Sequence, residues 1–355
     1  MTVLGTGKKP YDSQNRARCI GLERQVTRVP LTKKNVISLL ATLSLRSAAV
    51  VIFISAGVVT ALSQSQALIE SESAIERAPA LTIRKQVQEV NLVVTVTDHR
   101  GRLVRDLRPS DFNIQDNGEL PKRITYFERQ ANLPLRIAVV VDTSSSIAES
   151  FGLEEKKAGQ FLTRNVRPES DLALVIGFAN RPRVEQSATN DTMLLSRTIR
   201  GLHVGGETAI YDAVSAAARE LGKINDSQPA RRAIILITDG EDNVSHIDLQ
   251  QAIEAAQLND CSVYVLSTNI DISSEAEAAE LAMKRLAEAT GGDVLRANTG
   301  NNLAKAFSDL EKELRSQYAI GYTPANLARN GSFHRLFVQG PKKLRILYRE
   351  GYFAR

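Results

Sequence analysis

The feature that most constrains the fold is a regular alternation of apolar runs and helical patterns over residues 134–317. The expected strands are RIAVVVD, DLALVIGFA, RRAIILIT, CSVYVL and a short DVLRA; the expected helices lie at about 150–166, 191–200, 209–224, 247–259, 275–290 and 301–317. Strands that are apolar throughout are buried on both faces, and helical crossovers make consecutive strands parallel. We therefore predict a doubly wound α/β domain with a mainly parallel, Rossmann-like sheet.

Segments with an alternating apolar pattern flank this domain on both sides. Residues 85–133 contain VNLVVTVTD and FNIQDNGELPKRITYFER, and turns at Gly101 and Asn117–Gly118 predict two hairpins. Residues 318–355 contain most of QYAIGYTP, then FHRLFVQG and LRILYREGY, with a turn at QGPKK. These C-terminal strands need a sheet to join. We therefore predict a smaller β domain built from both flanks, with the α/β domain inserted into it.

A basic head and an uncharged apolar run precede the predicted domains. The apolar run is SAAVVIFISAGVVTAL, residues 47–62, and small residues follow it. This order is typical of a secretory signal, and an uncleaved membrane anchor is the alternative. The predicted segments are a basic N-terminal segment at 1–46, a signal h-region or anchor at 47–63 and a linker at 64–84. The remainder is expected to be exported (periplasmic, cell-surface or secreted), with membrane contact only through the N-terminal segment.

The net charge of +5 does not indicate a nucleic-acid-binding protein. Residues 1–46 carry +7, so the remainder carries −2. A nearly neutral domain has no bulk field that would attract polyanions, and nucleic acid is excluded as the default partner. Of the two cysteines, only Cys261 lies after the apolar run, so the exported part has no internal disulfide and depends on its core for stability.

Three loops rich in oxygen donors are expected at the carboxyl edge of the parallel sheet. The first is Asp142-Thr-Ser-Ser-Ser146; the second is GGET, which ends in Thr208 and opens a helix; the third begins at Asp239, directly after the IILIT strand. Functional loops of open parallel sheets lie at this edge. Each loop alone is also explained as a helix cap or a turn, because Asp, Ser, Thr and Gly are favoured there.

Taken together, the three loops predict a site for a hard divalent cation. Asp142, Ser144 and Ser146 stand at alternate positions of one turn, and Thr208 and Asp239 add a hydroxyl and a carboxylate. Mg²⁺ prefers six oxygen ligands and often keeps several waters. The loops offer no imidazole or thiol, which argues against zinc or copper.

The order D-x-S-x-S after the first strand, a Thr in a Gly-rich loop, and D-G after a later strand resembles the von Willebrand factor type A (VWA) domain. The resemblance covers roughly residues 134–317, and all five positions of that family's metal-ion-dependent adhesion site are present. The flanking β segments resemble bacterial exported proteins of the "VWFA-related" type.

The resemblance implies how the site works. Ser144, Ser146 and, when ligated, Thr208 would touch Mg²⁺ (Mn²⁺ or Ca²⁺ being alternatives), while Asp142 and Asp239 would act partly through water. A Glu or Asp of a protein partner would supply the missing oxygen. The resemblance also implies that the last helix can shift when the metal gains a ligand. Two further residues, Glu241 and Asp242, are interpreted as ordinary loop residues, with support of the metal ligands as the alternative.

No catalytic residues are predicted. The chain has no GxSxG elbow, no P-loop and no GxGxxG after the first strand. We therefore predict a non-enzymatic protein-binding module of the adhesion or scaffold type. Two alternatives stay open: a metal-assisted hydrolase, for which no positioned base is marked, and a structural scaffold whose metal only stiffens the loops.

Overall fold

The computed structural model describes residues 89–129, 133–226, 230–269, 273–326 and 330–354. The chain divides into two units, Met1–Arg84 and Lys85–Arg355. The predicted basic segment, signal or anchor, and linker lie outside the described residues. No helix within the described ranges is long and apolar enough to cross a membrane.

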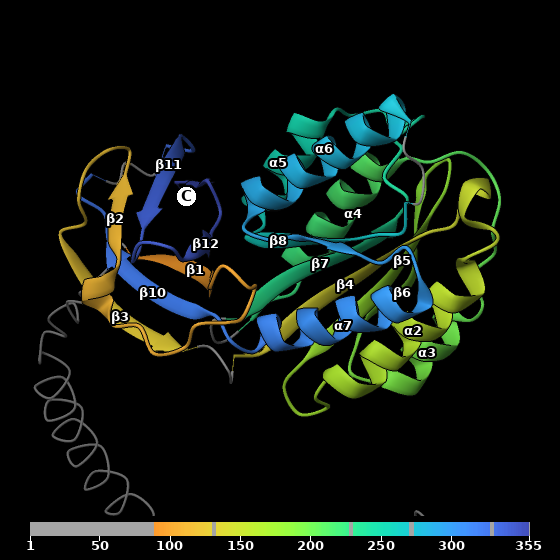
Figure 1. Ribbon diagram of the computed structural model, residues 1–355, viewed down its shortest axis with the longest axis horizontal. Coiled ribbons are helices and arrows are strands. Elements are labelled where there is room, and N and C mark those ends of the chain that lie inside the picture. The colour runs from red at the N-terminus through yellow and green to blue at the C-terminus, as the bar shows by residue number, and fades with distance from the viewer. Residues whose placement is uncertain (1–88, 130–132, 227–229, 270–272, 327–329, 355) are drawn as a thin grey trace, which may run out of the picture. The chain divides into compact units, whose positions relative to one another are not determined.

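The α/β domain is built on a six-stranded sheet with the order β6-β5-β4-β7-β8-β9 (Figure 1). Its strands are β4 (Leu135–Asp142), β5 (Leu172–Phe178), β6 (Pro182–Thr189), β7 (Arg231–Thr238), β8 (Cys261–Ser267) and β9 (Val294–Arg296). All pairs are parallel except β5 with β6, so the predicted mainly parallel sheet is confirmed. The edge strand β6 was not predicted, because its polar sequence PRVEQSAT has no buried residue to mark it.

Helices cover both faces of this sheet (Figure 1). On one face lie α2 (Phe151–Asn165), α3 (Thr192–Ile199) and α7 (Gly300–Leu314); on the other lie α4 (Ile210–Gly222), α5 (Leu249–Leu258) and α6 (Ser274–Thr290). Alternate residues of a strand enter opposite layers, because successive side chains point to opposite faces. Val139 packs in the cluster that contains Phe307 of α7, and Val140 in the cluster that contains Val214 of α4.

The flanking segments form two further sheets, with orders β12-β1-β10-β3 and β13-β11-β2. The elements are β1 (Val90–Thr97), a 3₁₀ helix η1 (Pro109–Asp111), β2 (Asn113–Asp116), β3 (Arg123–Arg129), β10 (Tyr318–Thr323), β11 (Phe333–Gln339), β12 (Arg345–Leu347) and β13 (Gly351–Phe353). Each sheet combines strands from before and after the α/β domain, as the predicted fold class requires. Leu92, Tyr318 and Tyr322 are fully buried in the shared core.

Neither predicted N-terminal hairpin forms. The turn at Gly101 is followed by a single bridge between Thr97 and Leu103. Asn117–Gly118 does make a tight turn, with φ of 51° and 82°, but β2 pairs with β11 and β3 pairs with β10. The ladder does not continue past this turn because Pro121 lacks the N–H that a paired strand needs. The turn chemistry was therefore correct and the strand partners were wrong.

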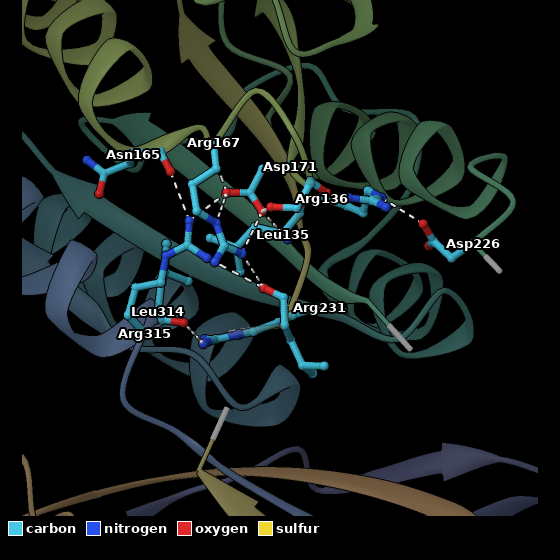
Figure 2. Close-up of polar contacts among 11 residues, drawn as sticks. Leu135, Arg136, Asn165, Arg167, Asp171, Asp226, Arg231, Leu314 and Arg315 are labelled. Carbon is cyan, nitrogen blue, oxygen red and sulfur yellow. Dashed lines mark hydrogen bonds and ion pairs between the residues drawn. The ribbon is translucent and has the colours of Figure 1, made fainter. Parts of the chain in front are cut away.

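A buried carboxylate, Asp171, is hydrogen-bonded to neighbouring residues at the end of the sheet where β4 begins (Figure 2). It accepts hydrogen bonds from Leu135 N (2.9 Å), from Arg167 Nε (3.0 Å) and from Arg315 Nη2 (2.6 Å). Arg315, which follows α7, also donates to the carbonyl of Asn165 at the end of α2 (2.9 Å). Burial alone would raise the pKa of Asp171, but these donors hold it well below its usual range. One carboxylate thus joins β4, α2 and α7.

A second buried polar network joins the end of α7 to β8 and β1. Gln317 Nε2 donates to Thr95 Oγ1 (2.6 Å) and to the Tyr264 hydroxyl (2.9 Å). Thr95 Oγ1 donates to Glu313 Oε1 (3.2 Å), and Arg231 Nη2 donates to the Tyr264 hydroxyl (2.9 Å). Thr95 belongs to β1, so the network crosses from the α/β domain to the β domain. α7 ends at Leu314, before the predicted residue 317.

Candidate metal centre

The three predicted loops meet at the carboxyl edge of β4 and β7. The first and second are joined by hydrogen bonds from Ser145 N to Gly206 O (3.0 Å) and from Gly206 N to Ser145 Oγ (3.1 Å). The second and third are joined by a bond from Asn243 N to Thr208 O (2.9 Å). Gly206 has a φ of 100°, and a Cβ there would lie 2.7 Å from Asn180 Oδ1, so glycine is required for this approach.

Asp142, the last residue of β4, is held by two donors within the site. Its Oδ2 accepts from Thr238 Oγ1 (2.7 Å) and its Oδ1 from Ser144 N (2.8 Å). The Ser144 and Ser146 hydroxyl oxygens lie 2.9 Å apart. Burial raises the pKa of Asp142 to about 6, and the negative charge of Asp239 acts in the same direction. The carboxyl is therefore fixed and buried, and it forms no salt bridge with the described residues.

Thr208 and Asp239 come from the other two loops. Thr208 is buried just before α4, and Asp239 directly follows β7. Asp239 Oδ1 is buried and has no hydrogen-bond partner in the described part of the chain. A buried acceptor without a partner costs about 1–3 kcal/mol, and in native proteins such atoms call for an ion or an ordered water.

The two other predicted loop residues differ in their surroundings. Asp242 Oδ1 accepts from Ile210 N (2.7 Å) and from Ser245 Oγ (2.6 Å). It therefore caps the N-terminus of α4 and fixes the third loop against the helix that follows Thr208. Glu241 is exposed to solvent.

Glu154, in the first turn of α2, was not predicted as a site residue. The residue is only 1% exposed, and its Oε1 accepts a hydrogen bond from Ser150 Oγ (2.7 Å). Burial, together with the negative charges of Asp142 and Asp239, raises its pKa to about 7. The sequence around it, FGLEEKK, gives little signal, since Glu155 has the same charge and is only partly buried.

Three buried oxygens near these loops have no hydrogen-bond partner among the described residues: Asp239 Oδ1, Glu154 Oε2 and Thr268 Oγ1. Thr268 follows β8, and its N–H donates to the carbonyl of Thr238 beside it (2.9 Å). No group of three or more His, Cys, Asp or Glu side chains in the described ranges forms a metal cluster of its own. The donors are thus mainly hydroxyls with a few carboxylates, a set that fits a hard divalent cation and its waters.

A shallow cavity of about 260 Å³ adjoins the first two loops. Thr143 and Gly205 line it on the loop side, and Arg181, Arg183 and His203 line it elsewhere. Arg183 is well exposed (75%), so its charge is presented to solvent. The surface beside the predicted metal position is therefore polar, and one of its two arginines, Arg183, pairs with Glu185 (3.5 Å).

Residues 137–309 match the model of the von Willebrand factor type A domain. The resemblance predicted from the sequence is thus confirmed for this part of the chain. No curated protein matches the chain.

Several solved structures match part of this chain at low identity. The PilB minor pilin from Streptococcus sanguinis is 17% identical, with 52% of this chain and 61% of the pilin covered and a TM-score of 0.41. Proximal thread matrix protein 1 from the mussel byssus, with a zinc-occupied MIDAS motif, is 16% identical, with 56% and 49% covered and a TM-score of 0.44. The von Willebrand factor type A protein from Catenulispora acidiphila is 13% identical, with 70% and 74% covered and a TM-score of 0.43.

Proposed function

We propose, from the match of residues 137–309 to the VWA model, that this chain is a metal-dependent protein-binding module of the adhesion or scaffold type. In this proposal Ser144, Ser146 and Thr208 contact a divalent cation, Mg²⁺ in the first place and Mn²⁺ or Ca²⁺ as alternatives. Asp142 and Asp239 also bind the cation, partly through water. When bound, the cation supplies an electrophilic position that a Glu or Asp carboxylate of a partner protein fills.

The observation that carries the proposal is that two neutral serine hydroxyls lie in the same group of loops as a buried oxygen of Asp239 that has no hydrogen-bond partner among the described residues. Ser144 and Ser146 bring their hydroxyls within 2.9 Å of each other, beside the fixed carboxyl of Asp142. Hydroxyls bind a cation without neutralising it, and carboxylates that act through water are further from it than direct ligands, so the cation keeps an attraction for an acidic partner. Arg181 on the adjoining cavity favours a negatively charged partner, whereas Arg183 already pairs with Glu185.

A binding role is favoured over hydrolysis. A metal-assisted hydrolase needs a base within reach of its substrate. The carboxyl nearest to that description, Glu154, is only 1% exposed, so a substrate at the loops does not reach it. We further propose that the module is exported, which rests on the basic head and the apolar run at 47–62. Nucleic acid is not proposed as a partner.

The first test is a titration of the full-length chain with Mg²⁺, Mn²⁺, Ca²⁺ and Zn²⁺, in mild detergent because of the apolar N-terminal run. Calorimetry and thermal melting are compared for wild type, Asp142→Ala and Ser144→Ala. Asp309→Ala, which removes an exposed carboxylate of α7, is the control. A cation at 100 times its Kd stabilises a folded protein by about 2.7 kcal/mol. Loss of this effect in the two site variants alone supports the proposal, and a wild type that binds no cation refutes it.

The second test concerns the partner. Immobilised peptides that present Glu are compared with the same peptides carrying Gln, with Mg²⁺ or with EDTA. The proposal requires capture that depends on both the carboxylate and the cation. Capture of Gln peptides to the same extent would show that the metal position is not the contact.

A further inference from the structure

The side chain of Glu154 is a buried acid whose second oxygen lacks any partner. The residue is 1% exposed, and Oε2 makes no hydrogen bond with the described residues. No Lys, Arg or His of the described chain forms a salt bridge with it, and its neighbouring charges, Asp142 and Asp239, are negative. Buried carboxylates are almost always paired or bound to a cation. This arrangement therefore points to a positive charge that the polypeptide itself does not supply.

A purely helical role does not account for this placement. Acidic residues are common in the first turn of a helix, where they interact favourably with the helix dipole, and Ser150 supplies a hydrogen bond to Oε1. Such roles are fulfilled on the surface at less cost. Burial of the carboxyl leaves Oε2 without a partner, and the helix dipole does not require that burial.

Thr268 lies beside Glu154. Its hydroxyl oxygen is buried at the end of β8, the strand beside β7, and makes no hydrogen bond of normal geometry with the described residues; as a nearby donor it lowers the pKa of the Glu154 carboxyl. With Asp239 Oδ1, this makes three unsatisfied oxygens on three different elements: α2, the β7 loop and the β8 end. Waters of a hydrated cation are donors that can satisfy acceptors placed just beyond the direct ligands.

We propose that Glu154 is a positioning residue of the metal centre, whose Oε2 accepts a hydrogen bond from a water of the bound cation and thereby raises the affinity of the site. The inference rests on the metal site of the proposed function. It assigns Glu154 no direct contact with the metal or with the partner. The carboxylate supplies negative charge behind the ligands while the neutral hydroxyls of Ser144 and Ser146 keep the metal open to a partner's carboxylate.

The test is a Mn²⁺ titration of the full-length protein by calorimetry, with electron paramagnetic resonance to count free Mn²⁺. Glu154→Gln keeps the shape and the acceptor for Ser150 but removes the charge. We expect its Mn²⁺ affinity to fall 10- to 100-fold, the usual cost of losing an outer hydrogen-bond partner of a metal ligand. In EDTA at pH 8 the same variant should melt at or above the wild-type temperature, because a buried, unpaired charge is gone.

Two further variants make the result specific. Glu155→Gln has the same charge change at the next position and should leave both the affinity and the metal-free melting temperature unchanged. Glu154→Asp keeps the charge but withdraws it by one methylene, and it should also weaken Mn²⁺ binding. If Glu154→Asp binds as tightly as wild type, the position of the oxygen is irrelevant and the proposal is wrong.

The outcomes separate this inference from the proposed function. A wild type that binds Mn²⁺, together with Glu154→Gln of equal affinity, overturns the role of Glu154 alone. A wild type that binds no Mn²⁺ overturns the metal site and this inference with it. Weaker Mn²⁺ binding in Glu154→Gln with a lower metal-free melting temperature would assign Glu154 to the structure of α2 and would also count against the inference.

Discussion

Replacing Asp171 by Asn tests whether one buried carboxylate holds the base of the α/β domain (Figure 2). The side chain of Asp171 is 0% exposed and receives charge-assisted bonds from Arg167 and Arg315 besides the N–H of Leu135. Removing one partner of a buried ion pair typically costs 3–5 kcal/mol, because the remaining charge is left uncompensated. Since Arg167 and Arg315 keep 36% and 21% exposure, water screens them in part, and we expect the lower value, about 3 kcal/mol.

The assay is urea unfolding at pH 7, followed by circular dichroism, beside Asp309→Asn as the control. Asp309 pairs with Lys305 on the exposed face of α7, so its loss should cost less than about 1 kcal/mol. The pH dependence has a fixed sign. The folded-state pKa of Asp171 is lowered, so its stabilisation is present above its unfolded pKa, about 4, and is lost as the pH falls below that value. Equal stability of Asp171→Asn and wild type at pH 7 would refute the reasoning.

Two other predictions concern buried titratable groups. In EDTA, the protein should lose stability as the pH rises from about 4 to about 7, because burial raises the pKa of Asp142 to about 6 and of Glu154 to about 7 and so disfavours their charged forms. The rise in the pKa of Glu154 from 4.5 to about 7 corresponds to a loss of roughly 3 kcal/mol of stability, at 1.36 kcal/mol per pH unit. Urea unfolding at pH 5 and pH 8, with and without Mg²⁺, should show this loss of stability only without the cation. Cys261 is 2% exposed and burial raises its pKa, so a maleimide should label it only in denaturant. Because Cys19 also carries a thiol, the label is located by peptide mapping, and rapid labelling of Cys261 itself in the native protein would contradict its burial.

The fold class was predictable because periodicity is a direct consequence of burial. Strands such as β4 and β7 are buried at every residue except the second, and that state requires the apolar runs seen in the sequence. The edge strand β6 has no such requirement, and it was missed. The N-terminal hairpins failed for another reason: a turn such as Asn117–Gly118 fixes the direction of the chain locally, whereas strand partners depend on β10 and β11, about 200 residues later.

The site was predictable to the extent that it lies at strand ends. Parallel strands bring their carboxyl ends to one edge, so Asp142 and Asp239 were expected to meet there, whereas Thr208 reaches them from the loop between α3 and α4. Glu154 and Thr268 lie near the same loops because α2 and the end of β8 pack beside them. Neither residue differs in sequence from an ordinary helix surface or strand terminus, and only their burial without partners distinguishes them.

Contacts at the end of α7 oppose the shift of this helix that the family resemblance implies. A displacement of α7 would break the bonds from Arg315 to Asp171 (2.6 Å) and from Thr95 to Glu313 (3.2 Å), and would disturb Gln317, which bonds Thr95 and Tyr264. Each buried polar group left unsatisfied costs about 1–3 kcal/mol. The total exceeds the 1–3 kcal/mol that couples two sites in a typical allosteric protein.

We therefore expect the response to metal to stay within the loops and α2. Hydrogen exchange measured with EDTA and with Mg²⁺ should show added protection over residues 142–154 and no change over 310–320. Bonds that are buried and paired in both states exchange slowly in both, because their opening requires wider unfolding. Faster exchange at 310–320 on addition of Mg²⁺ would show that α7 does leave these contacts. The β domain, which shares Thr95 and Gln317 with that network, would then be the receiver of the signal.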